Sequence, residues 1–207
     1  MSRFTTRALA ALLAGTLTAA AFAQAGDPHL RLGAAHFRAG RFDEAVVEFK
    51  VARALGSGDE APWYVAAALT RAGRNLDALE AFEEAAEIAP RSADALFLYY
   101  RGVACSQAQL VVCAAESFEL AASSSGPRVA EQARRLAAEA RALLAAEPPR
   151  AAIDTLLARA EDGARKGRAR LSLAFAREAG ALAARRLDRW RALEAQQLLG
   201  RADGGRP

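Results

Sequence analysis

The sequence predicts an all-α protein: a right-handed α-solenoid of stacked helical hairpins, followed by a diverged helical cap. The 207-residue chain is rich in alanine, a strong helix former, and has only 7 prolines and 15 glycines to interrupt helices. In its first half a pattern of small and aromatic residues recurs after about 33 residues, and in its second half apolar residues follow spacings of three and four. Self-similarity at this period is the signature of a solenoid of helical hairpins.

Residues 1–25 have the organisation of a secretory signal peptide. Two arginines and no acid occur in MSRFTTR, an apolar run too short to span a bilayer comfortably follows in ALAALLAGTLTAAAFA, and two A-x-A cleavage sites lie in AFAQA. An uncleaved N-terminal anchor is the alternative, disfavoured because no longer apolar stretch and no basic flank follow. We therefore expect a mature chain that begins near Gln24 or Gly26 and lies in the periplasm or outside the cell.

Residues 26–126 are expected to form about three hairpins. Corresponding residues of the first two copies lie 33 positions apart: Gly40 and Gly73, Ala45 and Ala78, Phe49 and Phe82, Ala52 and Ala85. The third copy repeats the internal spacing 36 residues later, with Ala114, Phe118 and Ala121.

Each repeated position has a physical role. Ala45 and Phe49 are four residues apart and Ala52 follows three later, so a small residue, a ring and a second small residue share one helical face. Small residues let a neighbouring helix approach closely, and Gly33 is expected to do the same on the preceding helix. Gly40 ends that helix where the backbone must turn. One hairpin cannot bury this stripe alone, whereas several stacked hairpins can.

These residues resemble the tetratricopeptide repeat, a 34-residue helix-turn-helix unit. The matching positions are Leu32, Gly33, Gly40, Phe42, Ala45, Phe49 and Ala52 in the first copy, and Gly73, Ala78, Phe82, Ala85 and Pro90 in the second. The third copy departs from the pattern, because Gly102 falls two residues late for the small-residue position and the turn counts about two residues too long. The resemblance covers residues 26 to about 122.

The resemblance implies a concave groove, lined by the first helix of each hairpin, that binds an extended or helical peptide. The positions that it implies are Leu30, Ala34, Phe37, Arg38, Trp63, Ala67, Thr70, Arg71, Phe97 and Arg101. Aromatic residues beside arginines are typical of interface hot spots, and Trp63 is the first candidate for contact. Alternatively, Phe37 and Phe97 pack against the neighbouring hairpin. The set lacks the lysine and asparagine clamp of repeat domains that hold a C-terminal carboxylate, so chaperone-tail binding is not supported.

Residues 127–201 are expected to form two further hairpins, the last acting as a cap, with a frayed tail at 202–207. The break SSSGP at 123–127 ends the third repeat, and EPPR at 147–150 must interrupt a helix. Four apolar stripes mark the helices: Val129, Ala133, Leu136, Ala140 and Leu143; Ile153, Leu157, Ala160 and Ala164; Leu171, Phe175 and Leu182; and Leu187, Trp190 and Leu198.

The two cysteines, Cys105 and Cys113, suit a disulfide that joins the end of one helix to the start of the next in an oxidising compartment. The alternative is a pair of small buried thiols. No metal site is expected, because His29 and His36 are distant from both cysteines and lie seven residues apart rather than four.

Charge separates the two halves of the chain. Residues 26–126 hold 14 acids and 9 bases, net −5, and residues 127–207 hold 10 acids and 17 bases, net +7. The basic patch at 165–170, RKGRAR, comprises Arg165, Lys166, Arg168 and Arg170. It is either a solvated turn or a surface for an anionic partner, and nucleic acid is disfavoured because aromatic residues are not interleaved with the bases. The acid cluster Asp77, Glu80, Glu83, Glu84 and Glu87 is expected on a solvent-exposed helix face.

No catalytic motif, cofactor site or metal site is found, so we expect a binding protein that is not an enzyme. The first hypothesis is a periplasmic adaptor or scaffold that binds an envelope protein or peptide through its groove. The alternative is an envelope structural element, in which the acidic half of one copy meets the basic half of another copy or the chain meets a polyanionic glycan or lipid surface.

Overall fold

The computed structural model describes residues 27–90, 94–124 and 127–203, so the predicted signal peptide at 1–25 and most of the predicted tail lie outside the described residues. Within these ranges the chain forms ten α-helices and no strand, which confirms the all-α, solenoid-like prediction. The helices are α2 (Pro28–Arg38), α3 (Phe42–Ala54), α4 (Ala61–Arg71), α5 (Asn75–Ile88), α6 (Ala95–Gln107), α7 (Val111–Ser124), α8 (Pro127–Ala145), α9 (Arg150–Arg165), α10 (Ala169–Arg185) and α11 (Arg189–Asp203).

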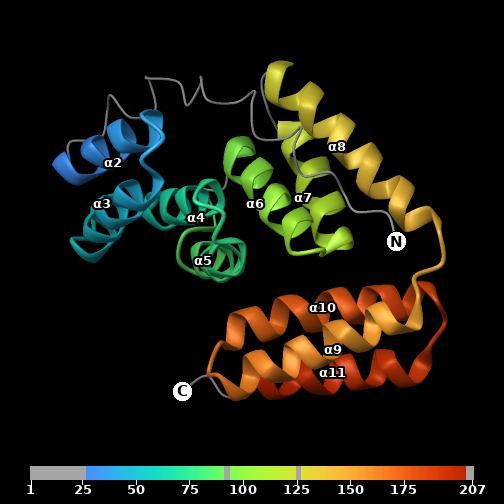
Figure 1. Cartoon of the computed structure of the whole chain (residues 1–207). Helices are drawn as coiled ribbons and strands as arrows, with labels where there is room; N and C mark the ends of the chain where they lie inside the picture. Colours follow the sequence, from blue (N-terminus) through green and yellow to red (C-terminus); the bar gives the residue numbers. More distant parts are fainter. Residues whose placement is uncertain (1–26, 91–93, 125–126, 204–207) are drawn as a thin grey trace.

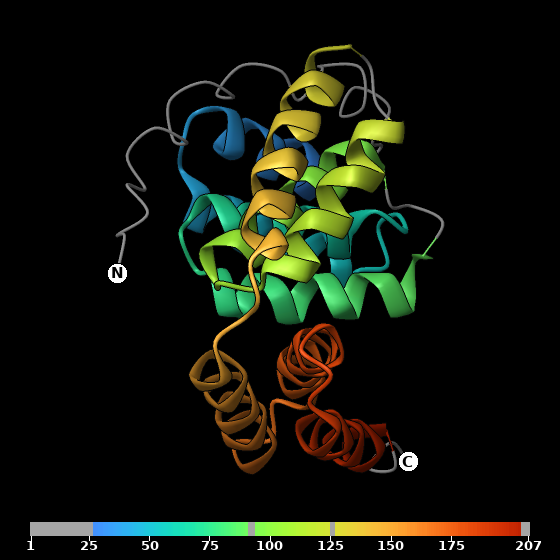
Figure 2. The same ribbon diagram turned by 90° about the vertical axis from the view of Figure 1, so that its right-hand side faces the viewer.

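The helices are arranged in two parts. Helices α2 to α8 pack consecutively into a curved array of hairpins, and α9 to α11 pack against one another beneath it. We call these parts the array and the C-terminal unit. Figure 2 shows that a single segment, between α8 and α9, joins them. Of the helices described, none is long and apolar enough to cross a membrane.

Aspartates begin the first helices of two hairpins. The Asp27 carboxylate accepts hydrogen bonds from the backbone N–H groups of His29 and Leu30, 2.6 and 3.1 Å away, at the start of α2. Asp94 accepts from Leu96 and Phe97, both at 2.9 Å, at the start of α6. These caps satisfy amide groups that have no partner within the helix, and so fix where each hairpin begins.

The hairpin turns share one backbone conformation. Gly40, Gly73 and Gly167 follow a helix in the left-handed region, at φ of 76°, 76° and 71°. Gln109 and Leu187 take the same position in the α6–α7 and α10–α11 turns, at φ of 66° and 59°. Glycine adopts this conformation at no steric cost, whereas leucine does so against its preference.

Close approach of a glycine to a phenylalanine ring defines the hairpin interior. A Cβ added to Gly33 would lie 2.6 Å from the Phe49 ring, and one added to Gly102 would lie 2.6 Å from the Phe118 ring. Both pairs are sixteen residues apart, and Gly40 and Gln109 both follow their glycine by seven. The expected displacement of Gly102 and the expected longer turn are therefore wrong. The extra residues instead lengthen the end of α5 and the start of α6, which leaves the hairpin itself unchanged.

The C-terminal helices pair differently from the two hairpins expected for 127–201. Helix α8 packs on α7 and α6 as a continuation of the array, while α9 packs on α10 and α11. Pro148 and Pro149 cause this separation, because proline lacks the amide hydrogen that would continue the helix.

The apolar stripes are buried over most of their length, but not at the expected ends. Leu143 at the end of α8 is 45% exposed, Ala164 at the end of the second stripe is exposed, and of the last stripe only Leu198 is buried. Leu187 and Trp190 are 87% and 81% exposed, because Leu187 lies in the turn itself and α11 turns a different face inward, with Ala195 beside Leu198.

Candidate functional site

The groove residues implied by the family resemblance lie mostly inside the array. The buried members are Leu30, Ala34, Phe37, Trp63, Ala67, Thr70 and Phe97. Trp63 is only 2% exposed, stacks on Phe97 with ring centroids 5.8 Å apart, and donates its indole N–H to the Ala89 carbonyl at 2.9 Å. These aromatic rings therefore connect neighbouring hairpins, which is the packing alternative stated for Phe37 and Phe97.

Two of the three arginines in that set are also engaged within the chain. The Arg71 guanidinium lies 4.7 Å from the centroid of the Phe42 ring, and Arg101 donates to the Glu83 carboxylate at 2.9 Å. Arg38 is exposed and, within the described part of the chain, donates only to the Ala34 carbonyl of its own helix, at 3.2 Å. Peptide binding along this line of residues stays a prediction.

The cysteine pair lies at one edge of the array. Cys105 in α6 and Cys113 in α7 have Cα atoms 5.8 Å apart, a separation typical of disulfides. The segment between them forms the α6–α7 turn.

Four acids of the cluster pair with arginines at and after the start of α10, and Glu84 pairs with Arg53 of α3 at 2.8 Å, so the expected solvent-exposed α5 face is wrong. Arg168 donates to Asp77 at 2.8 Å and to Glu80 at 2.9 Å. Farther along the two helices Arg170 donates to Glu87 at 3.0 Å. Arg177, two turns farther along α10, donates to Glu83 at 2.7 Å. The acidic and basic halves thus meet within one chain. The charge pattern of the sequence had suggested such contacts only between two copies or with another polyanion.

The basic patch at 165–170 is therefore divided by the fold. Arg165 and Lys166 pair with Asp162 in the preceding turn of α9, at 3.4 and 2.7 Å, whereas Arg168 and Arg170 face α5. Burial alone would raise the pKa of the Asp77 carboxyl, but Arg74 and Arg168 hold that pKa below its ordinary value. The patch does not present its charges to solvent as a single surface.

Glu178 connects the C-terminal unit to the array through hydrogen bonds. This α10 side chain is 3% exposed and accepts hydrogen bonds from the backbone N–H groups of Val112 and Cys113, at 2.7 and 3.0 Å. Leu110 precedes α7 and has no side-chain group that could cap this helix. The Glu178 carboxylate, 66 residues after Val112, supplies the cap instead. Burial raises the pKa of the Glu178 carboxyl, and the two amide groups oppose this rise.

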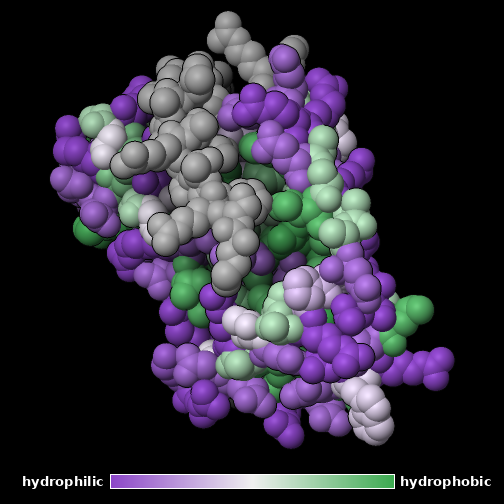
Figure 3. All heavy atoms as spheres, turned by 45° about the vertical axis from the view of Figure 1, so that its right-hand side comes forward, coloured by the Kyte–Doolittle hydropathy of each residue, from purple (hydrophilic) through white to green (hydrophobic). Residues whose placement is uncertain are grey.

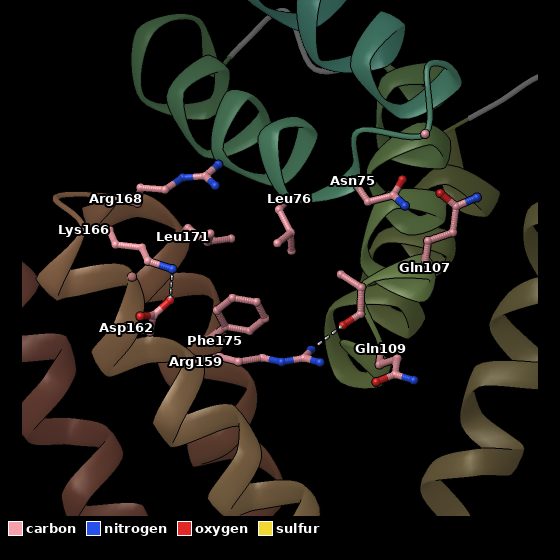
Figure 4. A pocket seen from close by; sticks show the side chains of 13 residues that line it. Asn75, Leu76, Gln107, Gln109, Arg159, Asp162, Lys166, Arg168, Leu171 and Phe175 are labelled. Atoms are coloured by element: carbon pink, nitrogen blue, oxygen red, sulfur yellow. Dashed lines mark hydrogen bonds and ion pairs between the residues drawn. The ribbon is translucent and has the colours of Figure 1, made fainter. Parts of the chain in front are cut away.

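A cleft of about 560 Å³ opens where the C-terminal unit meets the array. We call it the junction cleft. Its walls come from the α4–α5 turn and start of α5, from the α6–α7 turn, and from α9 and α10 (Figure 4). The lining residues are Gly73, Asn75, Leu76, Gln107, Ala108, Gln109, Arg159, Asp162, Gly163, Lys166, Arg168, Leu171 and Phe175.

One cation of the cleft has no carboxylate partner. Among the described residues no acid pairs with Arg159, whose guanidinium lies 5.7 Å from the centroid of the Phe175 ring and makes a long 3.5 Å contact to the Ala108 carbonyl. Lys166 and Arg168, by contrast, are paired with acids. The Arg159 charge is thus the one that remains for a ligand.

The opposite wall offers polar groups beside apolar side chains. Asn75 lines this wall, but its Oδ1 is buried from solvent and has no hydrogen-bond partner among the described residues. Gln107 and Gln109 carry exposed amides, and Figure 4 shows Leu76, Leu171 and Phe175 between these amides and Lys166 and Arg168, whereas the Arg159 guanidinium lies beside Gln109. Such a site can hold a ligand with a carboxylate, an amide N–H and an apolar group.

Sequence reasoning named Lys166 and Arg168 of this cleft but not Arg159 or Asn75. No motif could have identified them, because the walls come from three segments that only the docking of α10 on α5 and α7 brings together. Within the described part of the chain, no group of three or more histidine, cysteine, aspartate or glutamate side chains is placed to hold a metal ion. Comparisons with protein-family models, curated proteins and solved structures find no match to this chain.

Proposed function

We propose that this protein is an exported adaptor that binds an acidic peptide segment in the junction cleft. The observation that carries the proposal is Arg159, a cation that lies over Phe175 in an open cleft and lacks a carboxylate partner among the described residues. An Arg–carboxylate hydrogen bond formed there would be shielded from water on one side by the Phe175 ring, which strengthens it.

The remaining groups favour a peptide over a simple anion. An extended peptide offers backbone N–H and C=O groups at regular intervals. The Gln107 and Gln109 amides can pair with peptide N–H and C=O groups, while Leu76 and Leu171 receive an apolar side chain. The recognised segment therefore combines an acidic residue with an apolar neighbour.

The proposal includes export and a Cys105–Cys113 disulfide. The signal-peptide pattern supports export, and the 5.8 Å Cα separation of the two cysteines supports the bond. The loop that this bond would close contains Gln107, Ala108 and Gln109, which form one wall of the cleft. An oxidising compartment would thus hold that wall in its binding geometry.

Association through the opposite charges of two copies has less support. Asp77, Glu80, Glu83 and Glu87 are already paired with arginines of the same chain. A second copy would have to displace these intramolecular contacts, which form at a much higher effective concentration.

The test is selection of binding peptides from a random peptide library on the immobilised protein, followed by affinity measurement with one selected acidic peptide. We expect Arg159→Gln to weaken binding by about tenfold or more, because it removes a charge-assisted hydrogen bond. The control is Arg134→Gln, which removes an exposed α8 arginine that does not line the cleft. Selection of peptides without acidic residues, or equal affinity for the two variants, would contradict the proposal.

A further inference from the structure

The α10–α11 turn carries an apolar surface that the junction cleft does not involve. Leu187 is 87% exposed, Trp190 is 81% exposed, and Leu193, one helical turn farther along α11, is 47% exposed. We call these three residues the apolar tip. Figure 1 places this turn at the end of the C-terminal unit that lies beside the α8–α9 connection. On the face seen in Figure 3 the surface of this unit is mainly hydrophilic, with single hydrophobic side chains standing out from it.

Leu187 has a backbone conformation that disfavours leucine. Its φ of 59° lies in the left-handed region, and its N–H donates to the Ala184 carbonyl three residues before it. Gly167 makes the same bond to Ala164 in the α9–α10 turn, at φ of 71°, so glycine serves this turn without strain. Neither backbone geometry nor burial accounts for a leucine here, which points to a role outside the folded chain.

Most charges around the tip are paired. The Asp188 side chain is buried and accepts from the Arg191 guanidinium at 3.0 Å, and Asp154, which is half-exposed, accepts from it at 3.1 Å. Arg186 likewise pairs with Glu147 at 2.9 Å. Arg189 is exposed, and no acid among the described residues pairs with it. Among the described residues, two exposed arginines at the tip, Arg185 and Arg189, have no acid partner, against one such acid, Glu194, so the unpaired charge at the tip is net positive.

We propose that the apolar tip inserts into the interface of an anionic lipid membrane. A convex tip has no pocket of its own, so it suits a partner that yields to it, as the headgroup region of a bilayer does. Tryptophan and leucine partition into that region, and an adjacent arginine can extend to the lipid phosphates. Anionic lipid complements the net positive charge and contributes to the attraction.

Two arginines attach the tip to neighbouring segments. Arg191 fastens the start of α11 to α9 through Asp154, and Arg186 donates to the Pro148 carbonyl at 3.0 Å in the α8–α9 connection. Insertion would then orient the whole C-terminal unit on the membrane, and would leave the cleft on α9 and α10 free for its own ligand.

The test uses the fluorescence of Trp190. The chain has two tryptophans, neither of them in residues 1–25, and Trp63 is buried, so a change on addition of vesicles reports the tip rather than the predicted signal peptide. We expect a blue shift with phosphatidylcholine vesicles that contain phosphatidylglycerol, and little shift with phosphatidylcholine alone. Leu187→Gly should raise the lipid concentration needed for half the shift by about tenfold, since one leucine side chain is no longer buried.

Leu187→Gly also removes the backbone strain, so its thermal midpoint should not fall below that of the unmodified protein. Loss of lipid binding in this variant cannot then be attributed to unfolding. The matched control is Leu55→Ala, which shortens a leucine that is 64% exposed in the array and should leave the shift unchanged.

Three results would overturn the proposal. The first is no shift with anionic vesicles, or an equal shift with neutral ones. The second is a shift that Leu187→Gly leaves unaltered. The third is a shift that appears without lipid as the protein concentration rises and that Leu187→Gly abolishes, because the tip would then bind a second copy of the chain.

Discussion

The contacts between hairpins of the array differ in kind from the contacts that hold the C-terminal unit to it. Between hairpins, Trp63 stacks on Phe97 and Tyr64 meets the same ring edge-on, with centroids 5.8 and 5.1 Å apart. Between the two parts, Arg168 pairs with Asp77 and Glu80, and a buried Glu178 caps α7. One interface is formed largely by rings and small residues, the other largely by arginines and carboxylates.

Because of this difference, the two kinds of contact should respond differently to salt and pH. Burial of apolar area depends little on salt or pH, so the array should keep its packing across conditions. Partly exposed ion pairs are individually weak and are screened by salt. Because the junction cleft exists only while α10 is docked on α5 and α7, solution conditions that loosen this docking should act on the cleft before they act on the array.

The largest expected effect tests the aromatic contacts of the array. Trp63→Ala removes a buried ring and leaves the Ala89 carbonyl without its indole donor, so we expect a loss of about 3–5 kcal/mol in the free energy of unfolding. Urea denaturation followed by circular dichroism measures it. Trp190→Ala is the matched control, with a change within about 0.5 kcal/mol, since Trp190 is exposed. Equal effects of the two substitutions would contradict the assigned packing.

A smaller effect is expected at Glu178, where the two parts are joined. Glu178→Ala leaves the amides of Val112 and Cys113 without an acceptor, which should cost about 1–3 kcal/mol. Hydrogen exchange of these two amides should accelerate, while exchange in α2 and α3 stays unchanged. Unaltered protection of Val112 and Cys113 would show that Glu178 is not their acceptor in solution.

The same residue gives the docking a pH dependence with a defined sign. Because burial raises the pKa of Glu178 above the value of 4.5 for an unperturbed glutamate, the folded chain holds its proton to higher pH than the unfolded chain does. Its contribution to stability is fully present below that value, and is lost as pH rises through the raised pKa. Glu178→Gln does not titrate, so the stability difference between the two proteins should shift in favour of the glutamine variant with rising pH, as denaturation at several pH values would show.

The smallest expected effect concerns a single ion pair between the parts. Arg170 and Glu87 are each about one-third exposed, so a double-mutant cycle of Arg170→Ala and Glu87→Ala should give a coupling energy of about 0.2–1 kcal/mol. That coupling should fall toward zero as NaCl rises from about 0.05 to about 0.5 M, because the screening length shortens to a few ångströms. A coupling energy that persists in high salt would mean that the contact is shielded from solvent.

The repeat pattern predicted the hairpins of the array because their determinants are local. Ala45, Phe49 and Ala52 share one face through helix geometry alone, and all three are buried as expected. The pattern misplaced the third hairpin because it presumes helices of constant length, whereas α5 and α6 are both longer than their counterparts in the preceding hairpins.

The sequence did not predict the exposure of functional candidates. Trp63 is an aromatic residue near arginines, as in many interfaces, yet it is buried between hairpins. Trp190 has the helical spacing of a core residue, yet it is exposed. Helical spacing identifies which residues share a face, but it does not say whether that face meets another helix or solvent. Burial depends on which neighbours the chain brings to that face.

By itself the sequence determined the helical class, the hairpin period and the proximity of Cys105 to Cys113, because each depends on residues close together along the chain. Only the tertiary structure decided that α10 lies on α5, that Glu178 caps a helix 66 residues away, and that Arg159 and Asn75 share a cleft. These contacts join segments many residues apart, and the proline break after α8 sets where α9 to α11 lie. Local spacing carries no information about such pairings, because their energy comes from surfaces that form only once the helices have packed.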